Sequence, residues 1–511
     1  MIRTYLLCAV FFLAALNCQP VHASDESSAS DIVSRPEQLK FPALNYEPPD
    51  ASKYRVALKT GPVAYLLPDR ALPLVNISIT VRVGEYLEPS DKIGLAELTG
   101  YLLSHGGTQK LTAEQMDERT AFLAADLHSM VGPYEGSVGL NLLSKDLDEG
   151  LQMLRDILTT PRFQDDKIAL RKQQMIQAMK ERNDDSSGIE SREYGILALG
   201  EDFWANRFST KDSVDGITRA DIEAFHKKWF HPGNFVVAVS GDFDPTEMQA
   251  RLEKLFGDWP FIGETPPPIP NNVRVAAPGI YLAEKDVNQG RVTILLPGVQ
   301  RDNPDYFALQ IMNDILGGGG FTSHIMNSVR SDEGLAYSAG SSFRGGTYYP
   351  TPFLARFQSK SRTVSYAASI VIKEIKKMTE KPPTAEELAI AKRSYILRFP
   401  EIFATKQKTG DIFAAEEFTG RAAKNPDYFK NYREKIKAVT ADEVLRVARK
   451  YLNPDQVALL IVGNTKEIST LLPEHPVELK SLSSGPIVKL PQRDPLTMKP
   501  INPKEKPTPL P

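Results

Sequence analysis

The hydrophobic positions of the chain first become periodic near residue 54. Residues 54–58 and 63–67 are apolar segments on either side of a Thr-Gly-Pro sequence, which is typical of a turn between β-strands. Every second position of residues 75–81 is valine or isoleucine, and this period of two predicts a strand with one buried face. Residues 94–104 have the apolar spacing of a buried helix, which we expect to end at the glycine pair that follows.

A duplication is visible when the two halves of the sequence are compared. Residues 218–242 and 440–464 are similar without a gap, and in each copy a helical pattern ends before a proline and an apolar strand follows. The residue pairs that keep this register are Lys228/Lys450, Trp229/Tyr451, Pro232/Pro454 and Gly241/Gly463. Residues 96–107 and 308–318 also correspond, each as a helix that ends in glycines. One similarity could arise by chance, but two in the same order indicate two related domains.

The order of the predicted elements indicates the fold class. Strands and long helices alternate in mixed order within each half, and much of the strand pattern is half-buried. This favours an α+β fold of two homologous domains, each a largely antiparallel sheet with helices packed on it. Proline-rich sequence separates the domains as a stiff linker, and ten prolines in the last 41 positions predict little packed structure there.

These patterns divide the chain into six segments. They are a signal peptide (1–23), an extended arm (24–48), an N-terminal domain (49–262), a linker (263–276), a C-terminal domain (277–470) and a proline-rich tail (471–511).

The first 23 residues have the features of a secretory signal peptide. Arg3 precedes an apolar run at residues 5–16, which is too short to span a bilayer as an ordinary helix, and small residues precede a cleavage point after Ala23. Lipid attachment at Cys18 is the alternative, although Asn17 stands where a small residue is expected. No later segment is a candidate for a membrane span. The signal peptide predicts an exported chain. Because cleavage would also remove both cysteines, such a chain suits a bacterial periplasm, the location that we expect, or the cell exterior.

Composition excludes several classes of function. The 61 basic and 64 acidic residues leave a net charge of -3, which argues against a large nucleic-acid-binding surface. Two cysteines cannot form a disulfide scaffold or a cysteine-rich zinc module. Seven histidines remain as candidate ligands or bases, but none outside the signal peptide has a histidine or acidic partner at a convincing ligand spacing. We therefore expect them to be ordinary surface or core residues.

Three sequence markers together carry a family resemblance. They lie at residues 83–96, which include Val-Gly-Glu and Gly-Leu-Ala, at residues 230–242, which begin Phe-His-Pro-Gly-Asn, and at residues 330–337. In this order and spacing the chain resembles the insulinase/pitrilysin-like zinc metallopeptidases, which include the mitochondrial processing peptidase and the core proteins of respiratory complex III. The resemblance covers about residues 54–465. It implies that the two domains form half of a clam-shell chamber.

Active members of that family carry the motif H-x-x-E-H on a helix. Its two histidines share a helix face and bind zinc, while the glutamate between them polarises a water molecule. At the matching positions this chain has Glu97, Gly100 and Tyr101, and Ala178 stands where a later helix would supply the third ligand. Glycine has no side chain, and tyrosine would first have to lose its phenolic proton. The resemblance therefore implies no zinc site and no catalytic residue in this chain.

A glycine run resembles another family feature. Gly317, Gly318, Gly319 and Gly320 precede a helix expected to begin near Thr322, without the Lys-Ser/Thr of a phosphate-binding P-loop. The run is similar to a shorter form of the glycine-rich loop in the non-catalytic subunit of the mitochondrial processing peptidase, where it is linked to substrate handling. The alternative is a helix-entry loop that needs close backbone approach.

Arg330 and Tyr337 match an arginine–tyrosine pair of the family. The resemblance implies that they reach the peptide near the scissile bond, and both side chains can donate hydrogen bonds to a carbonyl or an oxyanion. Gly334, between them, is expected to end the helix so that a strand can start. Taken without the resemblance, Arg330 would be a surface charge and Tyr337 a core aromatic residue.

The loss of the zinc residues and the presence of the arginine–tyrosine pair lead to one hypothesis. We expect an exported, non-catalytic, substrate-binding subunit of a heteromeric zinc metallopeptidase, with zinc held by a homologous partner subunit that has H-x-x-E-H. One alternative is a peptide-binding or structural assembly protein without peptidase activity. A second is a stand-alone zinc peptidase with atypical ligands.

Overall fold

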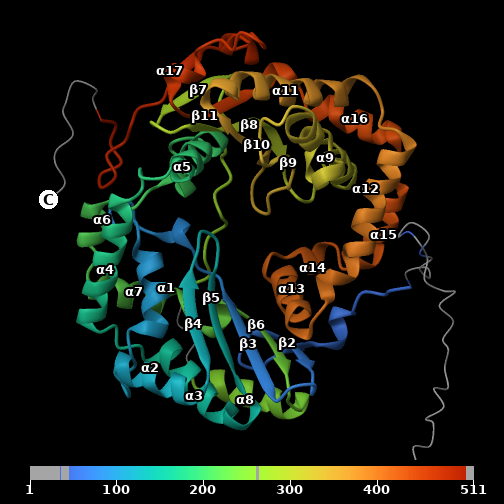
Figure 1. Ribbon diagram of the computed structural model, residues 1–511. Coiled ribbons are helices and arrows are strands. Elements are labelled where there is room, and N and C mark those ends of the chain that lie inside the picture. The colour runs from blue at the N-terminus through green and yellow to red at the C-terminus, as the bar shows by residue number, and fades with distance from the viewer. Residues whose placement is uncertain (1–34, 36–38, 40–44, 260–263, 502–511) are drawn as a thin grey trace, which may run out of the picture. The chain divides into compact units, whose positions relative to one another are not determined.

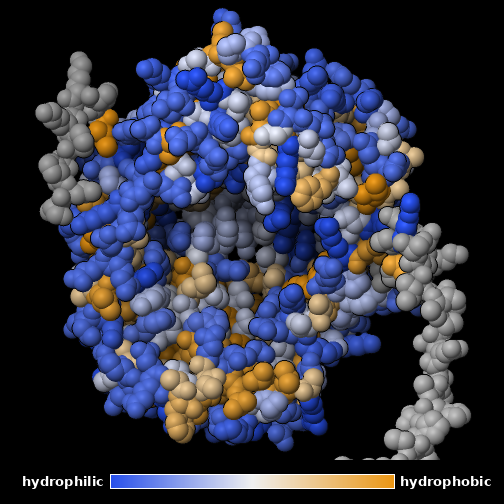
Figure 2. Space-filling view, in the orientation of Figure 1, coloured by the Kyte–Doolittle hydropathy of each residue, from blue (hydrophilic) through white to orange (hydrophobic). Residues whose placement is uncertain are grey.

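The computed structural model describes residues 35, 39, 45–259 and 264–501, and the described residues from Glu47 onward form one compact unit. The predicted signal peptide, with Cys18, and most of the predicted arm lie outside the described residues. Within the described part of the chain, no helix is both long enough and apolar enough to cross a membrane. Figure 2 shows that hydrophilic residues cover most of one face, with smaller hydrophobic patches between them.

The N-terminal half is built on a six-stranded sheet in the order β1-β2-β6-β3-β5-β4 (Figure 1). Its strands are β1 (Arg55–Ala57), β2 (Val63–Pro68), β3 (Leu74–Val81), β4 (Asp126–Val131), β5 (Gly136–Leu143) and β6 (Phe235–Gly241). Only the β2–β6 pairing is parallel. The period-two prediction for β3 is confirmed, because the valines and isoleucines are buried while the residues between them are half-buried.

Helices pack on this sheet and close the first core. They are α1 (Leu95–His105), α2 (Ala113–Phe122), α3 (Leu147–Thr159), α4 (Asp165–Lys180), α5 (Ser186–Leu199), α6 (Lys211–Asp215), α7 (Arg219–Trp229) and α8 (Pro245–Gly257). Helix α1 is the predicted buried helix, and it ends at Gly106 as expected. Ahead of it, the Glu88 carboxylate accepts hydrogen bonds from the backbone N–H groups of Gly94 and Ala96, at 3.0 and 2.7 Å.

The C-terminal half repeats this plan with the sheet order β12-β7-β11-β8-β10-β9. Its strands are β7 (Gly279–Glu284), β8 (Gln289–Val299), β9 (Ala339–Ser342), β10 (Thr351–Lys360), β11 (Ala458–Gly463) and β12 (Ile487–Lys489). In both sheets the strand that follows the repeated helix pairs in parallel on one side and antiparallel on the other. The predicted α+β fold of two related, largely antiparallel domains is therefore confirmed.

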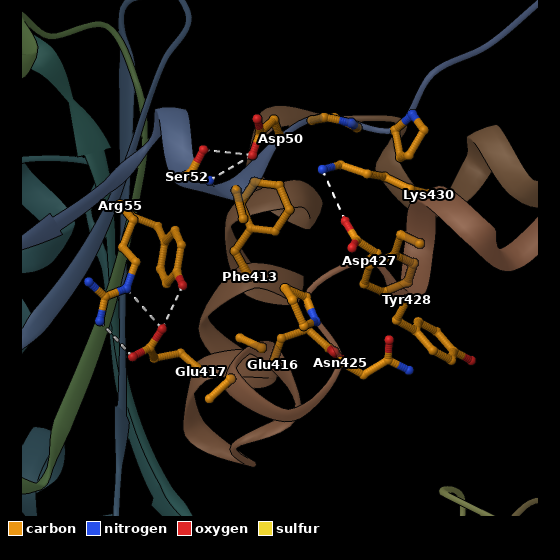
Figure 3. Close-up of a pocket in the computed structure, with 18 residues that line it drawn as sticks. Asp50, Ser52, Arg55, Phe413, Glu416, Glu417, Asn425, Asp427, Tyr428 and Lys430 are labelled. Carbon is orange, nitrogen blue, oxygen red and sulfur yellow. Dashed lines mark hydrogen bonds and ion pairs between the residues drawn. The ribbon is translucent and has the colours of Figure 1, made fainter.

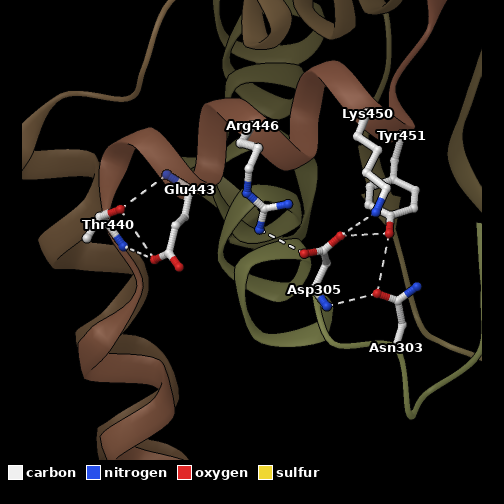
Figure 4. Close-up of polar contacts among 7 residues, drawn as sticks. All are labelled: Asn303, Asp305, Thr440, Glu443, Arg446, Lys450 and Tyr451. Carbon is white, nitrogen blue, oxygen red and sulfur yellow. Dashed lines mark hydrogen bonds and ion pairs between the residues drawn. The ribbon is translucent and has the colours of Figure 1, made fainter.

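The helices of the C-terminal half are α9 (Tyr306–Asn313), α10 (His324–Met326), α11 (Val364–Glu380), α12 (Ala385–Arg398), α13 (Lys406–Phe418), α14 (Arg421–Lys424), α15 (Tyr428–Ala438), α16 (Ala441–Tyr451) and α17 (Thr465–Ile468). Asp305, just before α9, accepts hydrogen bonds from Arg446, Lys450 and Tyr451 of α16 (Figure 4). Chiefly through the hydrogen bond from Arg446, the pKa of Asp305 is held well below its usual range.

The duplication extends to the first turn of the repeated helices α7 and α16. Each begins at a threonine capping box, in which Thr218 pairs with Asp221 and Thr440 pairs with Glu443. Each helix leads through a short turn at the repeated proline into its central strand, β6 or β11. The sequence similarity therefore marks the same helix–turn–strand unit in both domains.

The two halves exchange one helix each, as Figure 1 shows for α5 and α13. Helix α5 packs on β8 and β11 of the C-terminal sheet, where Glu190 accepts a 2.6 Å hydrogen bond from the Thr293 hydroxyl. Helix α13 packs on β2 and β6 of the N-terminal sheet. Its Glu417 accepts hydrogen bonds from Arg55 and Tyr65, at 2.9, 3.0 and 2.8 Å (Figure 3). Neither half is thus complete without the other.

The proline-rich tail is more structured than the sequence predicts. Strand β12 adds in parallel to β7, and so takes the edge position that β1 takes in the first sheet. Leu479 and Leu482 are buried, and Arg493 forms an ion pair with Glu201 at 2.8 Å. The expectation of little packed structure is wrong for residues 479–501, because a short apolar segment between two prolines is long enough to pair with an open sheet edge.

Candidate functional site

The residues at the H-x-x-E-H positions are held by an arginine from the neighbouring helix. The Arg171 Nη2 of α4 lies 2.8 Å from Oε1 of Glu97 on α1. The Arg171 guanidinium carbon also lies 4.3 Å from the centre of the Tyr101 ring, and that ring stacks on His105 with 4.1 Å between ring centres. A protein cation therefore contacts the two positions at which the family would have zinc-binding histidines.

Gly100, at the position of the catalytic glutamate, lies directly against strand β4. A Cβ atom at Gly100 would come within 2.3 Å of the Val131 backbone nitrogen and 2.7 Å of the Met130 carbonyl carbon. The Ser129 hydroxyl fixes this approach, because it donates a 2.6 Å hydrogen bond to the Gly100 carbonyl and accepts one from the Ser104 N–H. The backbone of β4 thus occupies the volume that a side chain at position 100 would need.

These residues do not fit a zinc ion. Glu97 is paired with Arg171, Tyr101 is stacked between two side chains, and position 100 has neither a carboxylate to activate water nor room for one. Ala178, at the expected third-ligand position, is exposed and has no ligand atom. In the part of the chain that the structure describes, no group of three or more histidine, cysteine, aspartate or glutamate side chains is arranged to hold a metal.

Sequence reasoning missed Arg171. It lies seven positions before Ala178, and therefore two helical turns away on the same side of α4. The signal available in the sequence was Glu97 itself. An acidic side chain on a helix that packs against another helix needs a positively charged partner to offset its loss of hydration.

The arginine–tyrosine pair lies in the C-terminal half, where Arg330 is half-buried and Tyr337 is exposed. Arg330 belongs to the π-helical segment Asn327–Asp332, and Tyr337 is 85% exposed. The Arg330 guanidinium carbon lies 4.7 Å from the centre of the Tyr337 ring. Gly334, at φ +61°, ends the helical segment as expected, but the next strand, β9, begins only at Ala339. The structure therefore brings the predicted pair together and leaves it accessible.

The glycine run is packed tightly against its surroundings. A Cβ atom at Gly317 would meet the Ser341 backbone nitrogen at 2.5 Å, and one at Gly319 would meet the Asp314 carbonyl oxygen at 2.7 Å. Gly320 has a positive φ of +64° and open space around it. These contacts favour the helix-entry explanation for the first part of the run. The expected helix near Thr322 begins at His324 with α10 and continues directly into the π-helical segment that contains Arg330.

Phe321 was not predicted from the sequence as part of this site. It directly follows the glycine run and is 68% exposed. Its ring centre lies 4.8 Å from the Arg330 guanidinium carbon, which also contacts Tyr337. Its signal in the sequence was an apolar residue directly after the glycine run and nine positions before Arg330.

Two family profiles match this chain. Residues 67–193 match the profile described as "Insulinase (Peptidase family M16)", and residues 216–395 match the one described as "Peptidase M16 inactive domain". The chain belongs to the M16 peptidase family. This confirms the insulinase-like resemblance seen in the sequence, and the second profile covers the glycine run, Arg330 and Tyr337.

Relatives of this M16 chain include proteins described as proteases and one described as a non-peptidase. An uncharacterized zinc protease of Mycobacterium leprae is 25% identical over 52% of this chain, and the match spans 60% of that protein's length. The non-peptidase homolog YmxG of Helicobacter pylori is 27% identical over 63% of this chain and 74% of its own length. Similarity at this level identifies the family without deciding between these two descriptions.

A solved structure shows the same fold. The peptidase M16 inactive domain from Pseudomonas fluorescens superposes with a TM-score of 0.71 at 23% identity, covering 80% of this chain and 98% of that one. This likeness extends through both domains and supports the architecture described above.

Proposed function

We propose that this M16 chain is an exported, non-catalytic, substrate-binding subunit of a heteromeric zinc metallopeptidase. The observation that carries the proposal is the contrast between its two sites. Gly100 and Arg171 close the site at which the family would bind zinc, whereas Arg330 lies beside the exposed Tyr337. Such a chain can hold a peptide but lacks the groups that would activate water.

The division of labour follows from this chemistry. A homologous partner subunit with H-x-x-E-H supplies zinc, whose role is to polarise the scissile carbonyl and activate water. In this chain, Arg330 and Tyr337 donate hydrogen bonds to carbonyl oxygens of the peptide or to the oxyanion that forms on attack. Strand β4, at the outer edge of its sheet, offers backbone groups to an extended peptide.

A second candidate function is a peptide-binding or assembly protein that has no peptidase partner. The arginine–tyrosine pair suits it equally, because holding a peptide does not require cleavage. A stand-alone zinc peptidase with atypical ligands is disfavoured, since Glu97 is paired with Arg171 and position 100 has no room for a base.

The test compares three preparations on a quenched-fluorescent peptide library: the mature chain, a homologous H-x-x-E-H subunit from the same organism, and their mixture. We expect chelator-sensitive cleavage in the mixture well above that of either chain alone. In the mixture, Arg330→Ala combined with Tyr337→Phe should lower cleavage, while the exposed-residue control Lys408→Ala should not. Equal cleavage by the partner with and without this chain would exclude the subunit role.

A further inference from the structure

We infer that Phe321 is a third substrate-contacting residue of the arginine–tyrosine site, and that it positions the Arg330 guanidinium. This inference rests on the proposed function and extends it to the recognition of the peptide. Phe321 and Tyr337 lie 4.8 and 4.7 Å from the Arg330 guanidinium carbon. The three side chains form one cluster, in which the half-buried Arg330 contacts two exposed aromatic rings.

The backbone around Phe321 is fixed on both sides, so its exposure is built into the fold. Before it, the glycine run packs without Cβ atoms against Asp314 and Ser341. After it, the Ser323 hydroxyl donates a 2.7 Å hydrogen bond to the Gly320 carbonyl, and His324 Nε2 lies 2.5 Å from the Glu387 carboxylate. In this inference, the role of the glycine run is structural: its tight turn places Phe321 at the surface beside Arg330.

The chemistry of the cluster indicates its ligand. Within the described residues, the Arg330 guanidinium makes neither a hydrogen bond nor an ion pair, so its donors are available. Aromatic contacts use the face of a guanidinium and leave its N–H edge free to bind a carboxylate or carbonyl oxygen. Phe321 adds exposed apolar surface next to that edge. The ligand class is therefore a peptide segment with an apolar side chain beside the carbonyl or carboxylate that Arg330 binds.

An ordinary surface contact in the same protein provides the comparison. Phe122 is 76% exposed, and its ring centre lies 4.7 Å from the Arg119 guanidinium carbon. Arg119, however, is already paired with the Glu149 carboxylate through two nitrogen atoms. The two phenylalanines are matched in exposure and in cation–π distance, but only Phe321 accompanies an arginine whose donors are free.

The experiment measures peptide binding by the mature chain alone. The probe is a fluorescein-labelled 15-residue peptide with Leu and Phe at alternate positions, and the readout is fluorescence anisotropy. Phe321→Leu, which keeps apolar volume but removes the ring, should weaken binding about three- to fivefold, as expected for one exposed cation–π contact. Phe321→Tyr should restore wild-type binding, and the matched control Phe122→Leu should not change it.

The outcomes separate this inference from the proposed function. Wild-type affinity in Phe321→Leu, alongside weakened binding in Arg330→Ala, would overturn the role of Phe321 and leave the subunit proposal intact. No binding by the wild-type chain would overturn both. A double-mutant cycle gives a further check, because Phe321→Leu should have a smaller effect when Arg330 is already alanine. Additive effects would contradict the positioning role, and thermal melts of each variant show whether folding has changed.

Discussion

The close approach of α1 to β4 predicts that Gly100 cannot accept even a methyl group. In Gly100→Ala, the new Cβ would start 2.3 Å from the Val131 nitrogen and 2.7 Å from the Met130 carbonyl carbon. Ordinary non-bonded contacts lie at about 3.5–4.0 Å, so helix and strand must separate by about 1 Å. Both obstructing atoms belong to the backbone, and no side-chain rotation can relieve the contact.

The size of the effect can be worked from the contacts that would change. Overpacking of this kind costs about 1–3 kcal/mol. Separation also strains the hydrogen bonds that the Ser129 hydroxyl makes with Gly100 and Ser104, each worth about 1 kcal/mol. Alanine returns about 1 kcal/mol through its higher helix propensity. We therefore expect Gly100→Ala to lower the free energy of unfolding by about 2–3 kcal/mol.

The assay is urea denaturation followed by circular dichroism. Gly188→Ala in α5 is the matched control, because its new Cβ would meet only the Arg182 carbonyl oxygen, at 3.2 Å, and its stability should change far less than that of Gly100→Ala. Restoring the motif with Glu97→His, Gly100→Glu and Tyr101→His should fail to give stoichiometric zinc by mass spectrometry. A stable Gly100→Ala variant, or a triple variant that binds one zinc per chain, would refute this account of the closed site.

Three further predictions concern stability. Burial raises the pKa of Glu88 to about 7, so the folded chain binds this proton more tightly than the unfolded chain. The stability that results is present below about pH 4.5 and is lost as pH rises through 7. In urea titrations, the free energy of unfolding of Glu88→Gln should therefore rise relative to wild type between pH 5 and 8, by about 2–3 kcal/mol. Residues 49–262 expressed alone should elute as aggregates in size-exclusion chromatography, because the apolar side of α5, including Ile189 and Leu197, loses the C-terminal sheet; a folded monomer would contradict the helix exchange. Truncation after Ser484 removes β12, the Arg493 ion pair and buried Met498. It should lower the free energy of unfolding by about 3 kcal/mol, and an unchanged melting temperature would show that the tail contributes nothing.

Much of the fold follows from local patterns in the sequence. The alternating apolar residues of β3 specify their strand, and the threonine–acid pairs at Thr218 and Thr440 specify where two helices begin. These signals act over a few residues, and so they can be read without knowing the rest of the chain. Their repetition in register was enough to predict two related domains.

The features that sequence reasoning missed all depend on contacts that a local pattern does not describe. Helix α5 gives no local sign that it will pack on the sheet of the other domain, and β12 is a strand only because the edge of β7 is open to it. Arg171 and Phe321 were missed for the same reason, since each contact joins segments that the pattern of one helix cannot relate. Local periodicity predicts which segments form helices and strands, whereas the residues that make up a site are determined by tertiary contacts between those segments.

The three positions on α1 that differ from H-x-x-E-H make the loss of a zinc site hard to reverse. Removing a histidine ligand alone would leave a cavity that could be refilled, but here Arg171 supplies the positive charge that Glu97 needs, and its guanidinium contacts the Tyr101 ring. A return to histidine at position 97 or 101 would leave the Arg171 charge beside an incoming cation. Glycine at position 100 meanwhile lets α1 and β4 pack more closely than any catalytic residue would permit. The closed site is thus a stable structural element of the domain, and under the proposed function peptide contact falls to the Arg330 cluster and to the edge of β4.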